Sequence, residues 1–187
     1  MNEALFACTA QSDCEKLIVE ITHRLSEIIR FRDVASDFRW IDVKYFDVVG
    51  TGNHKDALAA VIANTWYDDD YASPSGALPV PSRGQHGPYS LESISVASFE
   101  KISPRKCRDA VRKWAALLGP LPVEFTKRCD DFLADLLIDA TAVFRLSELD
   151  DTARHEWNGQ LGVLGFHEFV IISPKTKTIA LVVASDD

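Results

Sequence analysis

The C-terminal stretch Leu161–Asp187, LGVLGFHEFVIISPKTKTIALVVASDD, is the feature that most constrains the fold of this chain. It contains two apolar runs rich in Val, Ile and Phe, at 163–172 and 178–184, joined by the turn residues 173–177. Two such runs joined by turn residues predict a β-hairpin. Because strands this apolar have to be buried, we expect other elements of the chain to cover the hairpin.

Residue patterns predict the remaining elements. Alternating apolar and polar residues predict a strand at 40–49, and Leu91, Ile94 and Val96 indicate another at 89–99. Apolar residues at helical spacing, with capping residues at several starts, predict helices near 13–31, 55–66, 104–118 and 124–146. We therefore expect a single α+β domain over residues 1–187, with an antiparallel sheet of about four strands, a C-terminal hairpin and about four covering helices.

Residues 73–89 interrupt this pattern with four prolines and three glycines, which exclude a helix or a central strand. A loop this long exceeds the usual ceiling of roughly 12–15 residues, and such loops are commonly functional. Two interpretations stay open: the loop folds back onto its own domain, or it recognises a partner.

The chain is acidic, with a net charge of −8 and a pI near 5.1. Residues 119–187 hold twice as many acidic as basic residues. This balance disfavours nucleic-acid binding, which needs a basic face, and permits a basic partner.

The sequence lacks an apolar run of membrane-spanning length and an N-terminal secretory signal. The four cysteines form no CxxC pair. We therefore expect a cytoplasmic protein with reduced thiols and no membrane association.

Catalytic motifs are absent from the sequence. Gly50-Thr51-Gly52 lies between a predicted strand and a predicted helix, but Lys55 occupies the third glycine position of a dinucleotide-binding loop. The G-x-S-x-G, P-loop and H-E-x-x-H patterns do not occur. His155 and His167, each followed by Glu, are the remaining candidates for a metal or acid–base site, although neighbouring strand residues such as His167 and Glu168 should point to opposite faces. We expect no cofactor and no bound metal.

Two acidic segments are candidate partner-binding sites. The first combines Trp66, Tyr67 and Tyr71 as aromatic anchors with Asp68, Asp69 and Asp70 as charges that steer a basic partner. The second is a ridge of Asp131, Asp135 and Asp139 along one predicted helix. Like charges at this spacing cost about 0.2–0.5 kcal/mol per pair, so the ridge either pairs with the basic helix before it or binds a cationic partner.

The apolar hairpin that carries His167-Glu168-Phe169 and ends in Ser185-Asp186-Asp187 resembles the ending of small acidic bacterial immunity proteins. These proteins accompany polymorphic or contact-dependent toxins. The resemblance implies a protein that binds a cognate toxin, or another basic protein, and occludes its active or substrate site. Two alternatives remain: a small metal-dependent or acid–base hydrolase that uses His155 and His167, and a non-catalytic assembly subunit whose loop 73–89 mediates self-association.

Overall fold

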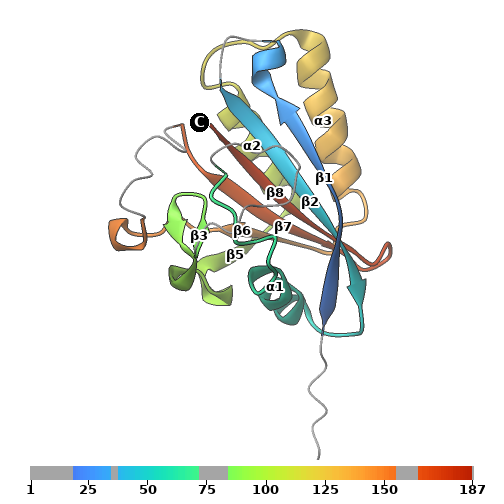
Figure 1. The fold of residues 1–187 in the computed structure, drawn as a ribbon. Helices are drawn as coiled ribbons and strands as arrows, with labels where there is room; N and C mark the ends of the chain where they lie inside the picture. The colour runs from blue at the N-terminus through green and yellow to red at the C-terminus, as the bar shows by residue number, and fades with distance from the viewer. Residues whose placement is uncertain (1–18, 35–37, 72–83, 155–163, 187) are drawn as a thin grey trace, which may run out of the picture.

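A six-stranded antiparallel sheet with the strand order β1-β2-β8-β7-β6-β5 forms the centre of the molecule (Figure 1). The structure, a computed structural model, describes residues 19–34, 38–71, 84–154 and 164–186. In chain order its elements are β1 (Glu20–Arg30), η1 (Phe31–Asp33), β2 (Arg39–Val49), α1 (His54–Ile62), β3 (Gln85–His86), β4 (Tyr89–Ser90), η2 (Leu91–Ser93), η3 (Val96–Ser98), β5 (Phe99–Ile102), α2 (Pro104–Ala115), α3 (Val123–Leu137), β6 (Ala142–Leu146), η4 (Asp151–Ala153), β7 (His167–Ser173) and β8 (Thr178–Asp186). Strands β3 and β4 form a separate two-stranded ribbon.

The predicted C-terminal hairpin is confirmed, and it lies in the middle of the sheet. β7 pairs with β6 and β8, while β8 pairs with β7 and β2. Every residue from Ile179 to Asp186 is buried. The predicted burial of these apolar runs follows from this central position, because both strands have neighbours on both sides.

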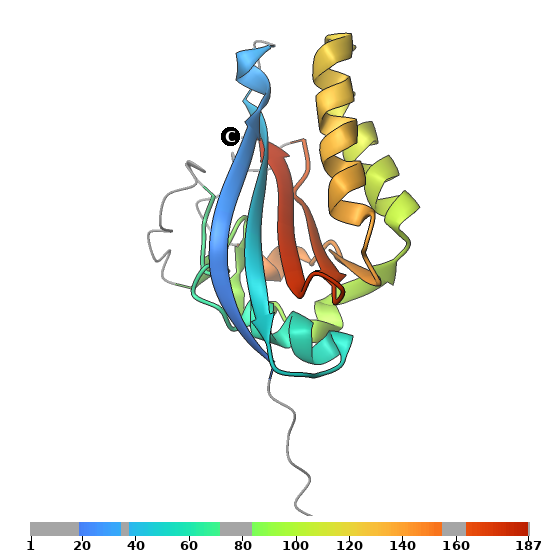
Figure 2. The same cartoon turned by 90° about the vertical axis from the view of Figure 1, so that its right-hand side faces the viewer.

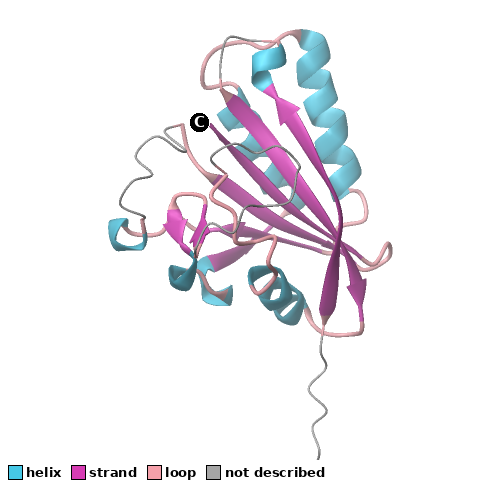
Figure 3. Ribbon diagram, in the orientation of Figure 1, coloured by secondary structure: helices cyan, strands magenta, loops and turns pink. Residues whose placement is uncertain are grey.

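The two faces of the sheet are covered by different parts of the chain (Figure 2). Helices α2 and α3 pack on one face, here the α2–α3 face, against side chains such as Val43, Phe169 and Val182. Helix α1, with segments 64–71 and 84–98, covers the other, here the α1 face, against side chains such as Phe46 and Leu181. In the view coloured by secondary structure, loops and short helical turns dominate this second cover (Figure 3).

Arg39 joins the start of β2 to the end of α2. Its Nη1 donates to the carbonyl oxygens of Trp114 (3.2 Å) and Ala115 (2.6 Å), and its guanidinium lies 4.7 Å from the centre of the Phe31 ring. The last carbonyls of a helix have no partner within the helix. Arg39 donates hydrogen bonds to two carbonyls at this end of the helix and so holds α2 against the sheet.

The helices predicted at 55–66 and 104–118 are confirmed, but both end earlier than predicted. Asn53 caps α1 by accepting from the backbone N–H groups of Lys55 and Asp56, and the Asp56 carboxylate accepts from the Asn53 N–H in return. Ser103 caps α2, and Pro104 occupies its first turn.

The predicted helix at 13–31 is wrong over its described part, because residues 20–30 form strand β1. Pairing with β2 shifts register between His23 and Leu25, which marks a β-bulge. The bulge changes which residues face each side, so that Ile21 and Ile28 both reach the α1-face core. Ile21 and Ile28 are seven residues apart, a spacing that puts two side chains on the same face of a helix but on opposite faces of a regular strand. The bulge allows this spacing on one face of a strand.

Two other predicted elements are corrected. The helix predicted at 124–146 ends at Leu137, and residues 142–146 form β6, which is buried on both faces. The strand predicted at 89–99 consists mainly of two 3₁₀ turns between the short strands β4 and β5. The α+β class with an antiparallel sheet is therefore confirmed, with six strands in the main sheet and three α-helices in the described part of the chain.

Of the helices in these described ranges, none has the length and apolarity that crossing a membrane requires.

Candidate functional site

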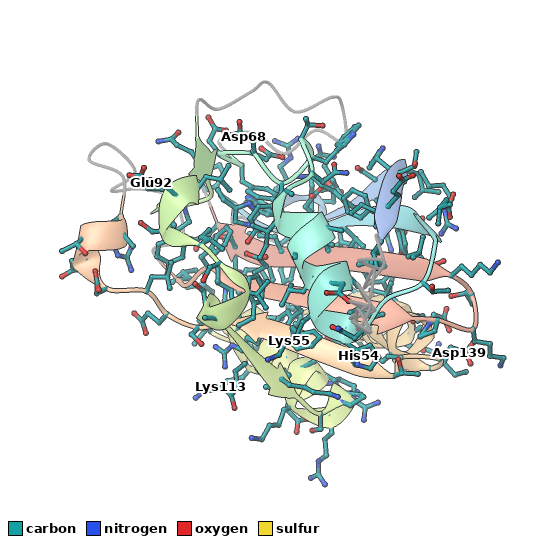
Figure 4. The ribbon with its side chains drawn as sticks, turned by 90° about the horizontal axis from the view of Figure 1, so that it is seen from below. His54, Lys55, Asp68, Glu92, Lys113 and Asp139 are labelled. Carbon is teal, nitrogen blue, oxygen red and sulfur yellow. The ribbon has the colours of Figure 1, made fainter. Side chains whose placement is uncertain are left out.

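The two predicted acidic segments lie on opposite faces of the sheet. Residues 66–71 belong to the cover of the α1 face, whereas Asp131, Asp135 and Asp139 lie on α3 or directly after it. Figure 4 shows Asp68 and Asp139 on opposite sides of the strands. The nine predicted partner-binding residues therefore do not form one surface.

Lys44, a buried residue of β2, holds the segment 66–71 against the sheet. Its Nζ donates to Asp69 Oδ2 (2.5 Å), to the Trp66 carbonyl oxygen (3.1 Å) and to the Tyr71 hydroxyl oxygen (3.1 Å). The other Asp69 oxygen accepts from the Tyr71 N–H at 2.9 Å. The Asp69 carboxylate thus neutralises a buried lysine of its own chain.

Asp68 also binds donors of its own chain. Its Oδ1 accepts from the backbone N–H groups of Gly84 and Gln85, both at 3.3 Å, and so joins the segment to the ribbon β3–β4. Tyr67 and Tyr71 are buried, while Trp66 and Asp70 are half-buried. The segment's role in partner binding stays a prediction, but its two tyrosines present no aromatic surface to a partner.

A second buried network joins this cover to β7. The Tyr67 hydroxyl donates to Glu168 Oε1 (2.9 Å), and His86 Nε2 lies 2.7 Å from Glu168 Oε2. The rings of Tyr67 and His86 stack with their centroids 3.6 Å apart. Burial, followed by the Glu168 charge, raises the pKa of Tyr67 well above its ordinary value. Tyr67 is therefore a neutral hydrogen-bond donor.

The position of the His86 proton follows from its contacts. Nδ1 lies 2.5 Å from the Tyr67 carbonyl oxygen, which can only accept, so Nδ1 carries a hydrogen. The short contact at Nε2 then requires one proton between the imidazole and the Glu168 carboxylate. The sequence gives no sign of this pair, because its members are 82 residues apart and belong to no motif.

His86 belongs to the Pro/Gly-rich loop predicted at 73–89. Residues 85–89 of that loop form the buried ribbon β3–β4, so this part folds back onto its own domain. Residues 73–83 lie outside the described part.

His167 and Glu168 point to opposite faces, as strand geometry predicts. His167 lies beside Trp114, with ring centroids 6.3 Å apart, and its Nδ1 is 3.5 Å from Arg145 Nη2. Burial and the Arg145 charge lower the pKa of His167 to about 4. Its proposed partner His155 lies outside the described residues, and within them no cluster of three or more His, Cys, Asp or Glu side chains is placed to hold a metal ion.

The acidic ridge on α3 is only partly neutralised. Asp131 pairs with Lys127 of the same helix, and Asp139 pairs with Lys175 of the β7–β8 turn at 2.9 Å. The ion pair between α2 and α3 uses Arg112 and Asp130 (2.5 Å), so the ridge does not pair with the basic helix before it. Asp135 makes no hydrogen bond or ion pair with any described residue.

Asp135 and Asp139 line a groove between α3 and the sheet, which we call the acidic groove. Its volume is about 320 Å³, and its walls are Arg24, Tyr45, Asp135, Leu136, Ile138, Asp139, Ile171, Ser173, Thr176, Thr178 and Ala180. The Arg24 charge is paired with Asp47 (2.9 Å). The Tyr45 hydroxyl donates to Glu27 Oε2 (3.3 Å). Carboxylates therefore outnumber cations in and around the groove.

The acidic groove has the chemistry to bind a cationic side chain. Burial first, then Glu27, with a smaller contribution from Asp135, raises the pKa of Tyr45, so this hydroxyl is neutral. Hydroxyl oxygens and unpaired carboxylates are acceptors for guanidinium and ammonium groups. Ile138, which is 80% exposed at the edge of the groove, offers an apolar contact for the methylene stem of Arg or Lys.

No family model, curated protein or solved structure matches this chain. The resemblance to immunity proteins thus stays a prediction.

Proposed function

We propose that this chain is an immunity-type protein that binds a cognate bacterial toxin, or another basic protein, and occludes its active or substrate site. The observation that carries the proposal is the acidic groove. Asp135 makes no ion pair with the described residues, lines the groove together with Asp139 and has the exposed Ile138 nearby. A carboxylate left unpaired among hydroxyl groups favours an incoming cation.

The ridge and the groove have complementary roles in this proposal. The ridge adds to the net charge of −8 and would attract a basic surface over a distance of about one Debye length, roughly 10 Å at 0.1 M salt. The groove then receives a single Arg or Lys side chain, where direct hydrogen bonds give specificity. The resemblance of the C-terminal hairpin to immunity proteins adds the class of partner.

The proposal is tested by co-expressing the chain with the product of any toxin-like gene that lies next to its own gene. The chain should protect cells from that product and form a complex with it. Changing Asp135→Asn and Asp139→Asn together should weaken the complex by about tenfold or more, equivalent to ~1.4 kcal/mol, and reduce its salt dependence.

Asp131→Asn is the matched control, because Asp131 lies on the same helix but does not line the groove. It should change the dissociation constant much less. A complex whose affinity and salt dependence are the same with and without the two groove carboxylates would show that the groove is not the binding site.

A further inference from the structure

The C-terminal end of α3 lies at the acidic groove and favours a cation. The last carbonyls of a helix have no partner within the helix and carry a partial negative charge, which basic side chains in the last turn commonly compensate. The last turn of α3 has no basic residue; Asp135 stands in it, and Asp139 follows two residues after the helix. Lys175 binds Asp139 through Oδ1, so Asp135 and Asp139 Oδ2 have no partner among the described residues. A cation from outside the chain would compensate both carboxylates and the helix end.

The opposite wall of the acidic groove presents hydroxyl oxygens whose hydrogens are already donated within the chain. Thr176 Oγ1 donates to the Ser173 carbonyl oxygen at 3.1 Å, and Thr178 Oγ1 donates to the Thr176 carbonyl oxygen at 3.1 Å. The Tyr45 hydroxyl donates to Glu27 Oε2 at 3.3 Å. A hydroxyl whose hydrogen is donated elsewhere keeps its lone pairs and acts towards a ligand as an acceptor. This wall therefore favours a ligand that brings several hydrogen-bond donors.

Ser173 adds a buried polar side chain without a partner to this wall. The residue is 9% exposed, and its hydroxyl makes no hydrogen bond with any described residue. Its neighbour Ile172 packs in the α1-face core, so strand alternation directs the Ser173 side chain to the α2–α3 face, where the residue lines the acidic groove. A buried hydroxyl is costly unless a ligand or a water molecule satisfies it. The groove thus holds an unused polar group at its base.

We propose that the acidic groove binds an arginine side chain of the partner protein and discriminates against lysine. The inference rests on the proposed function and names the side chain that the groove selects. A guanidinium group carries five N–H donors in one plane, so it reaches the carboxylates of α3 and the hydroxyl oxygens of the sheet at once. An ammonium group has three donors on a single nitrogen and reaches fewer of them. Guanidinium is also more weakly hydrated, which suits the apolar side chains in the groove, namely Leu136, Ile171 and Ala180.

The cation among the groove's own described residues does not neutralise Asp135. Arg24 is paired with Asp47 at 2.9 Å, and its guanidinium lies 5.6 Å from the centre of the Tyr45 ring. A metal ion is disfavoured as the ligand, because the described residues contain no group of three or more His, Cys, Asp or Glu side chains placed to hold one. An organic cation with several donors fits the groove better.

NMR titration of the backbone amides with three blocked peptides, Gly-Gly-Xaa-Gly-Gly with Arg, Lys or uncharged citrulline at Xaa, tests this. The Arg peptide should shift the signals of 135–139 and 173–178 and bind at least ~5-fold more tightly than the Lys peptide, and the citrulline peptide should bind least. Equal binding of the Arg and Lys peptides at these residues overturns the preference but not the proposed function, which needs only a cation. No shift there with any peptide also overturns the inference, and the toxin complex of the Asp135→Asn, Asp139→Asn protein then decides the proposed function separately.

Two uncharged substitutions locate the source of the preference. Ser173→Ala and Thr178→Val remove hydroxyls from the sheet wall without changing the charge of the groove, so each should lower the Arg-to-Lys affinity ratio ~3-fold and change the affinity for the Lys peptide little. Asp135→Asn should weaken both peptides. Asp131→Asn, on the same helix but outside the groove, is the matched control and should affect either peptide much less. An Arg-to-Lys ratio that stays the same in both hydroxyl variants would overturn the proposal.

Discussion

His86 and Glu168 are hydrogen-bonded inside the molecule, with Nε2 and Oε2 2.7 Å apart and both side chains fully buried. One residue lies in the ribbon β3–β4 and the other in β7, so the pair joins the cover of the α1 face to the sheet. Tyr67 completes the set through the second Glu168 oxygen. A buried pair with every donor and acceptor satisfied determines how the cover is placed.

Truncation of Glu168 should destabilise the protein strongly. In Glu168→Ala, the Tyr67 hydroxyl and His86 Nε2 lose their partners inside the protein, and we expect the free energy of unfolding to fall by ~3 kcal/mol. Glu168→Gln should cost less than ~1 kcal/mol, because an amide can donate to Nε2 and accept from the Tyr67 hydroxyl. Urea denaturation measures both. Glu100→Ala, at an exposed position of β5, is the control. Equal losses for Ala and Gln would contradict the hydrogen bonds that Glu168 makes with His86 and Tyr67.

Asp42 should make stability depend on pH. Burial raises its pKa to about 6, opposed by Lys44 and assisted by Asp69. Between pH ~4 and ~6 the folded protein then binds a proton that the unfolded chain releases, so this residue's contribution to stability decreases as pH rises. Asp42→Asn removes the effect, and the stability of the variant relative to wild type should increase by ~3 kcal/mol at most from pH 4 to pH 7.

Denaturation of both proteins at several pH values measures this difference. Lys44 keeps its bonds to Asp69, Trp66 and Tyr71 in the variant, so the substitution leaves no unpaired lysine. Asp47→Asn, on the same strand but exposed, should show no such trend. A difference that is independent of pH would be inconsistent with a raised pKa at Asp42.

His167 should titrate far below an ordinary histidine. Its pKa of about 4 results from burial and, second, from Arg145. Folded His167 is therefore neutral where unfolded His167, with an ordinary pKa near 6.5, is charged, and its contribution to stability is lost as pH falls from ~6.5 towards 4. NMR titration of the imidazole should give a midpoint near 4, and Arg145→Met should raise it. A midpoint above ~6 in the folded protein would rule out this environment.

Gly87 should not tolerate a side chain. A Cβ there would lie 2.3 Å from Phe166 Cε2, and Gly87 has a φ of +54°. Gly87→Ala should cost ~2 kcal/mol or more in unfolding free energy, from overpacking added to backbone strain. Gly84→Ala is the matched control, because Gly84 also has a positive φ but a Cβ at that position would meet no atom within 4 Å. Phe166→Leu should recover part of the loss in Gly87→Ala, and no recovery would place the cost in the backbone alone.

Elements with a single local pattern were predictable from the sequence. Strand β2 alternates apolar and polar residues, the central hairpin is continuously apolar, and α1 and α2 begin at Asn53 and Ser103 with capping side chains. β1 was not predictable, because its bulge gives a strand the apolar spacing of a helix. The end of α3 was also missed, because neither Gly nor Pro separates Leu137 from the buried strand β6.

The acidic ridge was visible from the spacing of Asp131, Asp135 and Asp139, but the groove beside it was not. The opposite wall consists of side chains from β1, β2, β7 and β8, which only the strand order brings under α3. In the same way, Lys44 meets Asp69 and His86 meets Glu168 through tertiary contacts that leave no local signal. Because only charge and aromatic content were visible in the sequence, Tyr67 and Tyr71 were predicted to lie at a partner-binding surface.

The bulge in β1 also affects how this chain behaves among its own copies. Among the described residues, β1 is an eleven-residue strand at the edge of the sheet, and a flat edge of that length is a template for ordered aggregation. A strand from another copy that paired along the whole of β1 could point its side chains to the same faces as β1 only on one side of residues 23–25. On the other side of the bulge, its side chains would point to the opposite faces. The bulge therefore opposes continuous pairing of a second copy along β1, which disfavours ordered edge-to-edge growth at this strand.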